Sequence, residues 1–195
     1  MDNLTKRIKE SGERARLTSL YRILVNFDGF KARDGLGPCI QLQSVVYILQ
    51  QMGFVSKLYD FSDDTAGPHS VQLDEDETEL SRHRRIIELN SGGELPDQYL
   101  LKEAYRNDYF EDNPLSKGKR APRVIDILKE ASAQSIFNLS KLLRYSEDEG
   151  ILPSLDPAHR KGLSNTSGVN YQQYKQALCL YRKLMSQNPK AQVFI

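Results

Sequence analysis

Histidines, clustered carboxylates and cysteines are the side chains through which most proteins bind metals or carry out catalysis, and this chain contains all three types. The histidines, His69, His83 and His159, fall in separate parts of the sequence, with no cysteine or second histidine at the spacing of a zinc site. Three aspartates gather in YDFSDD, residues 59–64, where solvated loop carboxylates are commoner than a cation site. The sequence therefore predicts no metal site and no cofactor.

Motifs of catalytic sites are also missing from the sequence. It has no Gly-x-x-x-x-Gly-Lys-Ser/Thr loop to hold phosphates and no Gly-x-Ser-x-Gly turn to present a nucleophilic serine. No lysine follows an Asp or Glu by two residues, an arrangement common beside the metal of nucleases. Cys39 and Cys179 stand in apolar helical patterns, which predicts buried free thiols. We therefore expect no catalytic residues and no enzymatic activity.

Basic residues form several short clusters that could contact phosphates, although a solvated helix face explains most such clusters. The segment KGKRAPR, residues 117–123, is the best candidate because it is dense in positive charge and free of acids. A second candidate is the cluster at residues 82–85. The predicted nucleic-acid contacts are Arg82, Arg84, Arg85, Lys117, Lys119, Arg120 and Arg123.

The stretch AGPHSVQLDEDETEL, residues 66–80, resembles the start of a helix, but a very acidic one. Ser70 can cap this helix, and large apolar residues then recur at heptad intervals. The acids precede the basic cluster at residues 82–85, an order that suits the helix macrodipole. These signals predict one helix from about Ser70 to Leu89.

The charge balance of the whole chain gives no general attraction to nucleic acid or to an anionic membrane. The 195 residues include 27 Lys and Arg against 26 Asp and Glu, for a net charge of +1. A hydrophobic content of 39% is ordinary for a folded domain with a good core. No apolar run is long enough to cross a bilayer, and the charged N-terminus does not resemble a signal peptide. We expect a cytoplasmic protein with no membrane contact.

Apolar periodicity outlines the elements of the first half of the chain. Residues 17–25 and residues 40–52 each show a helical pattern followed by a glycine. Residues 54–61 loosely alternate, which predicts a short strand or an extended connector. Another helix is expected to begin at Pro96.

The second half has two further helical patterns. Residues 124–145 are helical with a break at Ser132 or Ser135, and residues 146–168 read as a long loop. Asn170 and Gln173 have the spacing of a capping box for a final helix. That helix carries Tyr171, Tyr174 and Tyr181 at heptad-like spacing, which is typical of a core or a protein interface. The expected fold is mostly α.

Three segments occur in an order found in a known group of proteins: IQLQSVVYILQQMGF, LYDFSDD and GPHSVQLDEDETEL. In this order they resemble the YwgA-type and Panacea-like bacterial proteins over roughly residues 15–90. Ser44 stands where that family usually has lysine, and His69 where it usually has tyrosine. A looser similarity is to the small middle subunits of defence systems built around an SMC- or ABC-type ATPase.

The resemblance implies a fold, a division of the chain and a biological setting. It implies a winged-helix-like domain, placed with a short hairpin at 15–95, and a helical extension packed on it at 96–195. The sequence itself adds a charged N-terminal segment at 1–14. The resemblance also implies no enzymatic activity and an association with anti-phage defence or toxin–antitoxin loci.

In a winged-helix domain the acidic helix would occupy the position that usually reads DNA. Each carboxylate beside a phosphate costs about 1 kcal/mol at a separation of about 4 Å in water, and a good base contact returns about 1–3 kcal/mol. We therefore expect this helix to face water or another protein rather than a DNA groove. The predicted protein-interface residues are Asp74, Glu75, Asp76, Glu77, Glu79, Tyr171, Tyr174 and Tyr181.

These observations predict a non-enzymatic adaptor that binds other proteins in a bacterial defence or regulatory complex. The expected partner is another protein, for which an ATPase, a toxin or another effector encoded nearby is the candidate. Any contact with DNA is expected to occur within that complex. The alternative is a DNA-binding regulator or antitoxin that uses the basic residues at 82–85 and 117–123 instead.

Overall fold

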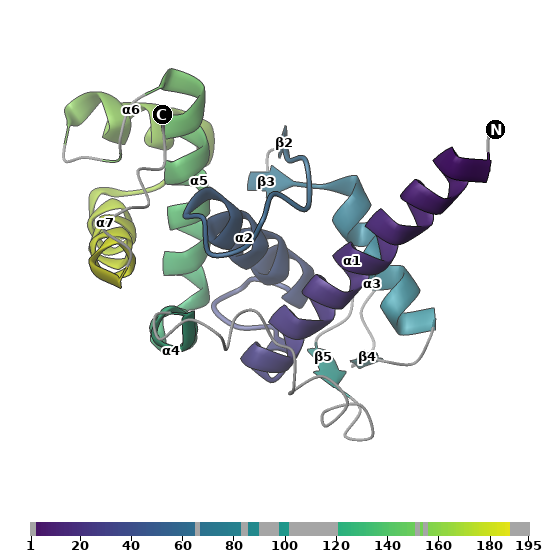
Figure 1. The fold of residues 1–195 in the computed structure, drawn as a ribbon. Helices are drawn as coiled ribbons and strands as arrows, with labels where there is room; N and C mark the ends of the chain where they lie inside the picture. The colour runs from purple at the N-terminus through teal and green to yellow at the C-terminus, as the bar shows by residue number, and fades with distance from the viewer. Residues whose placement is uncertain are drawn as a thin grey trace.

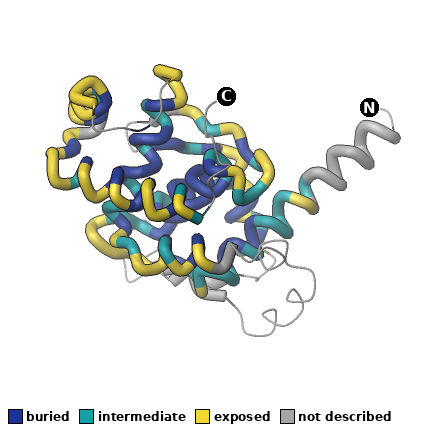
Figure 2. The backbone as a smooth tube through the Cα atoms, turned by 60° about the vertical axis from the view of Figure 1, so that its left-hand side comes forward, coloured by how far each residue is buried: buried dark blue, intermediate teal, exposed yellow. Residues whose placement is uncertain are grey.

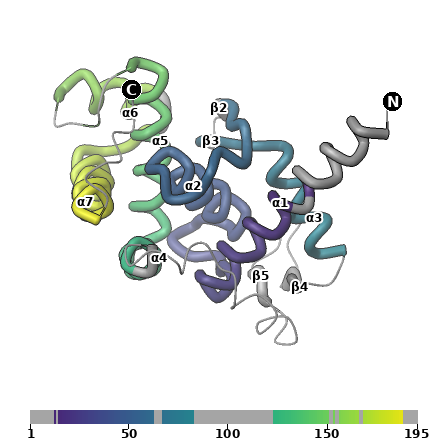
Figure 3. Tube along the Cα trace, in the orientation of Figure 1, coloured from purple at the N-terminus to yellow at the C-terminus, as the bar shows by residue number. Residues whose placement is uncertain are grey.

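The structure, a computed structural model, describes residues 3–64, 67–82, 86–89, 98–101, 121–150, 153 and 156–187. This part of the chain is mostly helical, as expected, and the order of its elements can be followed in Figures 1 and 3. Its helices are α1 Asn3–Phe27, α2 Pro38–Gln51, α3 Val71–Arg82, α4 Ala121–Glu130, α5 Ala133–Glu149, α6 Pro157–Ser167 and α7 Tyr171–Gln187.

The described residues up to Leu101 also form two small antiparallel sheets. In the first sheet, β5 (Gln98–Leu101) lies between β1 (Phe30–Lys31) and β4 (Ile86–Leu89). In the second, β2 (Ser62–Asp64) pairs with β3 (Gly67–His69) just before α3. The first sheet thus joins a strand that follows α1 to the two strands that follow α3.

Helix α1 ends where its sequence predicts. Asp28 and Gly29 both have positive φ angles, of 58° and 82°. The Gly29 N–H donates to the Leu24 carbonyl at 3.0 Å, which satisfies one of the free carbonyls at the end of the helix. Glycine tolerates this left-handed backbone and aspartate is among the residues that visit it. The chain therefore reverses sharply after Phe27.

Helix α2 is the central helix of the core, as its apolar sequence predicts. Every residue from Gln41 to Leu49 is buried, and Gly53, with a φ of 67°, follows the end of the helix. Helix α2 packs against α5. The two helices meet partly through small residues: the hydroxyl oxygens of Ser44 and Ser140 lie 3.2 Å apart in a buried hydrogen bond.

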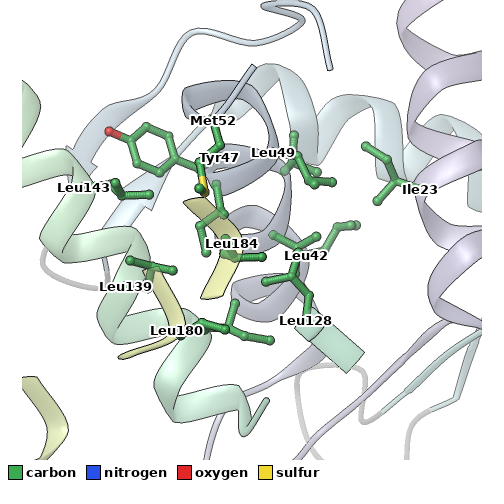
Figure 4. Close-up of a cluster of buried hydrophobic side chains, with 14 of the residues drawn as sticks. Ile23, Leu42, Tyr47, Leu49, Met52, Leu128, Leu139, Leu143, Leu180 and Leu184 are labelled. Carbon is green, nitrogen blue, oxygen red and sulfur yellow. The ribbon is translucent and has the colours of Figure 1, made fainter. Parts of the chain in front are cut away.

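One hydrophobic core joins the two halves of the chain. Figure 4 shows Leu42 and Leu49 of α2 in the same cluster as Leu139 and Leu143 of α5 and Leu184 of α7. Figure 2 shows the corresponding burial on the inner sides of these helices, with exposed residues along the outer surface. Residues 90–97, which contain the expected domain boundary, lie outside the described residues, so the division at 95 stays a prediction.

Two of the predicted helices are wrong in part. Helix α3 ends at Arg82, and residues 86–89 form strand β4 rather than the last turns of a helix. The segment expected to begin a helix at Pro96 instead contributes strand β5, with Ile86 paired to Leu101 and Leu89 to Gln98. Apolar residues seven positions apart do not distinguish one long helix from a shorter helix that is followed by a strand. The antiparallel pairing of the two segments overrides their weak helical pattern.

The break predicted in the 124–145 helix is confirmed at Ser132. The Ser132 hydroxyl accepts the backbone N–H of Ser135 at 3.1 Å and caps the start of α5. The capping box of α7 is confirmed as well: Gln173 accepts from the N–H of Asn170 at 2.9 Å, and Asn170 accepts from the N–H of Gln173 at 3.0 Å. Both devices act within a few residues, so the sequence alone reveals them.

The long loop predicted at 146–168 is wrong, because α5 runs to Glu149 and residues 157–167 form α6. Asp156 caps α6 by accepting the Ala158 N–H at 2.7 Å, and Pro157 is its first residue. Proline is common in loops, but it is also favoured in the first turn of a helix.

The two cysteines are free, as predicted, but their predicted burial is wrong. Cys39 is only partly buried at the start of α2, and Cys179 is exposed on α7. The residues beside Cys179 in sequence, Leu178 and Leu180, face the core instead. Among the described residues, no helix combines the length and the apolar character that a membrane crossing needs.

Candidate functional site

The five acids of α3 divide between the inside and the outside of the protein. Asp76 and Glu77 are each 4% exposed, whereas Asp74 and Glu79 are half-buried and Glu75 is exposed. The helix contacts α1 on one side, and Leu73 and Leu80 enter the core. The acidic sequence is therefore not one solvated face.

Asp76 joins three separate segments of the chain. Its carboxylate accepts from Arg16 Nε of α1 at 3.2 Å and from the Tyr59 hydroxyl of the connector at 2.9 Å. Burial, and then the charge of Asp76, raise the pKa of Tyr59. The ion pair is partly buried, and removing Arg16 would leave the buried carboxylate of Asp76 without a compensating charge. Asp76 is thus a structural residue, and its carboxylate is not available to a partner protein.

Asp74 is the centre of a polar cluster between α2 and α3. Gln43 Nε2 donates to Asp74 Oδ1 at 2.7 Å, and the Cys39 thiol donates weakly to the same oxygen at 3.6 Å. His69 Nε2 lies 2.7 Å from Asp74 Oδ2. The cluster ties the β3 end and the first turn of α3 to two consecutive turns of α2.

The side-chain amide of Gln43 hydrogen-bonds to the backbone of Ser70 through both its oxygen and its nitrogen. Its Oε1 accepts from the Ser70 N–H at 3.0 Å, and its Nε2 donates to the Ser70 carbonyl at 3.1 Å. The Ser70 hydroxyl itself is buried and makes no hydrogen bond, so the prediction that it caps α3 is wrong. The backbone of Ser70 is held by Gln43 instead.

Cys39, Asp74 and Glu77 place a sulfur and two carboxylate oxygens within 4.8 Å of one another, close enough to share a metal ion. Asp74 Oδ1 already accepts from Gln43 and Cys39, so the carboxylate has partners without a metal. In this arrangement the cluster orders the start of α3.

The outer face of α3 combines exposed charge with one exposed apolar side chain. Val71 is 64% exposed, and Glu75 follows it by one helical turn. Further along, Glu79 pairs with Arg82 at 2.6 Å. Asp74, Glu75 and Glu79 thus remain accessible at least in part, and of the predicted acidic interface these are the residues that a partner can reach.

The predicted tyrosine stripe of α7 is largely core. Tyr174 and Tyr181 are 1% and 7% exposed, and burial raises the pKa of each. Tyr171 is 51% exposed, with Lys175 Nζ 4.5 Å from the centre of its ring. Of the three tyrosines, Tyr171 is the one that can contact another protein.

The predicted nucleic-acid residues are described only in part. Arg82 and Arg123 are exposed, at the end of α3 and in the first turn of α4. The other five, Arg84, Arg85, Lys117, Lys119 and Arg120, lie outside the described residues.

Sequence reasoning missed the Asp74 cluster, although a signal for it exists. Cys39 and Gln43 are four residues apart, so they share one face of α2 and reach the same carboxylate. The pairing of that face with α3 is a tertiary contact that the sequence does not reveal.

A comparison of the chain with known proteins finds no matching family model, no matching curated protein and no matching solved structure. The resemblance to the YwgA-type and Panacea-like proteins therefore stays a prediction.

Proposed function

We propose that the protein is a non-catalytic adaptor, in which a winged-helix-like scaffold presents α3 to a partner protein in a bacterial defence or regulatory complex. The order of elements supports this scaffold. Helices α1, α2 and α3 precede the antiparallel strands β4 and β5, and β5 also pairs with β1, which lies between α1 and α2. The hairpin of β2 and β3 is an addition between α2 and α3.

The observation that carries the proposal is the outer face of α3. In a helix-turn-helix the equivalent helix places its N-terminal residues against base edges and near phosphates. Here that end presents Val71 and Glu75, which offer an apolar contact and a negative charge. Such a surface repels a polyanion and favours a protein with a basic or apolar contact surface.

Affinity purification of the tagged chain from its native host tests the proposal. A partner should co-purify with the wild-type chain and be lost from V71R/E75R, which changes exposed residues only. The matched control is E130R/Q176R, which makes the same change in net charge at exposed residues of α4 and α7 and should retain the partner. Recovery of the same proteins with the α3 variant, or a strictly monomeric chain with no partner, would contradict the adaptor.

A DNA-binding regulator or antitoxin is the second candidate, and the exposure of Arg82 and Arg123 favours it. It requires duplex binding that weakens steeply with salt. Changing Arg84, Arg85, Lys119 and Arg120 to alanine should abolish that binding. Absence of binding at low salt would end this alternative.

A further inference from the structure

A groove with an apolar floor lies where the end of α1, strand β1, the start of α2 and the end of α4 meet, and none of its described lining residues belongs to α3. It encloses about 280 Å³. We call it the Phe27 groove. Its main lining residues are Phe27, Phe30, Lys31, Arg33, Gln41 and Lys129.

Two stacked phenylalanines form the apolar part of the groove. The rings of Phe27 and Phe30 lie 5.2 Å apart with an interplanar angle of 19°. The left-handed backbone of Asp28 and Gly29 reverses the chain between them, so that both rings lie on the same side of the turn. Phe30 is 5% exposed and Phe27 is half-buried, so Phe27 offers apolar surface to the groove.

The loop that borders the groove is held in place by one buried side chain. Gln41 is 2% exposed, and its Nε2 donates to the carbonyls of Lys31 at 2.6 Å and Leu36 at 2.9 Å. Its Oε1 accepts from Arg33 Nε at 3.2 Å. The backbone that carries the two basic side chains is therefore ordered before any ligand arrives, which lowers the entropic cost of binding.

A tight turn and a helix cap fix the tip of the same loop. Asp34 and Gly35 have φ angles of 55° and 77°, and Arg33 and Leu36 exchange backbone hydrogen bonds at 3.1 and 2.9 Å. The Asp34 carboxylate accepts a hydrogen bond of 2.9 Å from the N–H of Ala133, which is the first residue of α5. The loop thus bridges α2 and α5.

The rim of the groove is predominantly cationic. Among the described residues, Lys31, Arg33 and Lys129 line it and are exposed, against one lining carboxylate, that of Asp28. This excess of positive charge contrasts with the acidic α3 face and with the near-neutral chain as a whole. An occupant must therefore combine negative charge with an apolar group.

We propose that the Phe27 groove binds an acidic peptide segment of a partner protein, which inserts one aromatic side chain over Phe27 while flanking carboxylates meet Lys31, Arg33 and Lys129. The cavity has room for one large side chain. A duplex would present phosphates to the cations but nothing to the apolar floor, so the combination favours a peptide. The proposal uses no residue of the α3 face, so the adaptor test above can fail without affecting it.

A titration of the isotope-labelled full chain, followed by its backbone amide NMR signals, tests the groove with the peptide acetyl-Asp-Glu-Phe-Asp-Glu-amide. We expect saturable shifts of residues 28–36 and a Kd of about 0.1–1 mM, as befits one anchored side chain. Replacing the peptide's Phe with Ala, or its acids with Lys, should weaken binding at least about tenfold, or about 1.4 kcal/mol.

The variant K31E/K129E should weaken binding of the peptide about tenfold or more, because it reverses two exposed charges and leaves Arg33 bonded to Gln41. The control K161E/K175E makes the same change in net charge on α6 and α7 and should bind as the wild type does. The proposal is overturned by no saturable shifts with about 2 mM peptide, by equal effects of the two variants, or by a duplex oligonucleotide that shifts residues 28–36 more strongly than the peptide.

Discussion

At the scale of single residues, Gln43 shows how one buried side-chain amide can supply the hydrogen bonds that a neighbouring strand would otherwise make to a buried backbone. It satisfies both backbone groups of Ser70 and one oxygen of Asp74, and it is itself 3% exposed. The chain needs such a side chain here because the link between β3 and α3 is buried beside α2 and lacks a strand partner at Ser70.

We predict that Gln43→Leu lowers the free energy of unfolding by about 2–3 kcal/mol. The leucine has a similar volume, but it leaves the buried N–H of Ser70 without a partner and removes a donor from Asp74. The Ser70 carbonyl keeps the N–H groups of Leu73 and Asp74. Urea unfolding measures the change, and Gln72→Leu, on the exposed side of α3, should alter stability by less than about 0.5 kcal/mol. Equal effects of the two substitutions would show that the Gln43 hydrogen bonds add nothing.

His159 adds a pH dependence to the stability of the α5–α6 contact. It is 3% exposed and packs edge-on against Tyr145, with ring centres 5.9 Å apart. Burial lowers the pKa of His159 below its usual 6.5, and this effect outweighs the carboxylates of Asp156 and Glu149, which raise it. The folded protein therefore favours the neutral ring.

A depressed histidine pKa stabilises the fold fully above about pH 6.5 and loses that contribution as the pH falls through the folded-state pKa. We predict that His159→Phe, which keeps the aromatic contact, reduces the fall in Tm between about pH 7 and pH 5. Thermal unfolding across that range measures it. Parallel curves for the variant and the wild type would assign the acid sensitivity to other groups.

At the scale of elements, the packing of α6 on α5 depends on the absence of a side chain. A Cβ added at Gly162 of α6 would overlap the ring of Tyr145 on α5. Glycine is a poor helix former, so close packing rather than helix propensity accounts for it here.

We predict that Gly162→Ala lowers stability by about 1–3 kcal/mol, because the clash exceeds the gain of up to about 1 kcal/mol in helix propensity. In a Tyr145→Ala background the same substitution should become stabilising by up to about 1 kcal/mol. The double-mutant cycle, measured by urea unfolding, should therefore show a change of sign. A destabilising effect in both backgrounds would place the strain elsewhere.

The elements that local signals define were predictable from the sequence, and those defined by distant contacts were not. The ends of α1 and α2, the cap at Ser132 and the capping box of α7 all depend on neighbouring residues. Strands β4 and β5 form because they pair with each other, and β5 also pairs with β1. A helical pattern in short segments cannot anticipate that pairing.

The candidate sites follow the same rule. The acidic segment is visible in the sequence, but the burial of Asp76 depends on Arg16, which lies 60 residues away. The Phe27 groove does have local signals, since the Asp34-Gly35 pair predicts a tight turn and glycine follows Asp28. The contribution of Lys129 comes from another part of the chain and is seen only in the fold.

At the scale of the whole molecule, the two halves of the chain depend on one core. Helix α2 is buried along most of its length; α5 packs against it, and α7 packs on α5 and α4 in the same core (Figure 4). Each large apolar side chain exposed by removing these helices costs about 1.5–3 kcal/mol, and several would be exposed at once. This total exceeds the stability of most small domains.

We predict that a fragment of residues 1–101 does not fold on its own. Its NMR amide signals should be poorly dispersed, it should bind a hydrophobic dye, and its thermal unfolding should lack a cooperative transition. A well-dispersed spectrum would show instead that the expected domain at 15–95 is independent of the C-terminal helices.

The hydroxyl pair of Ser44 and Ser140 has a consequence for how α2 and α5 find their alignment. Leucines alone tolerate sliding of one helix along another, since one apolar neighbour replaces the next. A shift of α5 by one turn, about 5.4 Å, would leave Ser44 facing an aliphatic side chain. The hydrogen bond between the two serines thus favours a single register of α5 against α2. A chain with lysine at position 44 would have to align these two helices through other contacts.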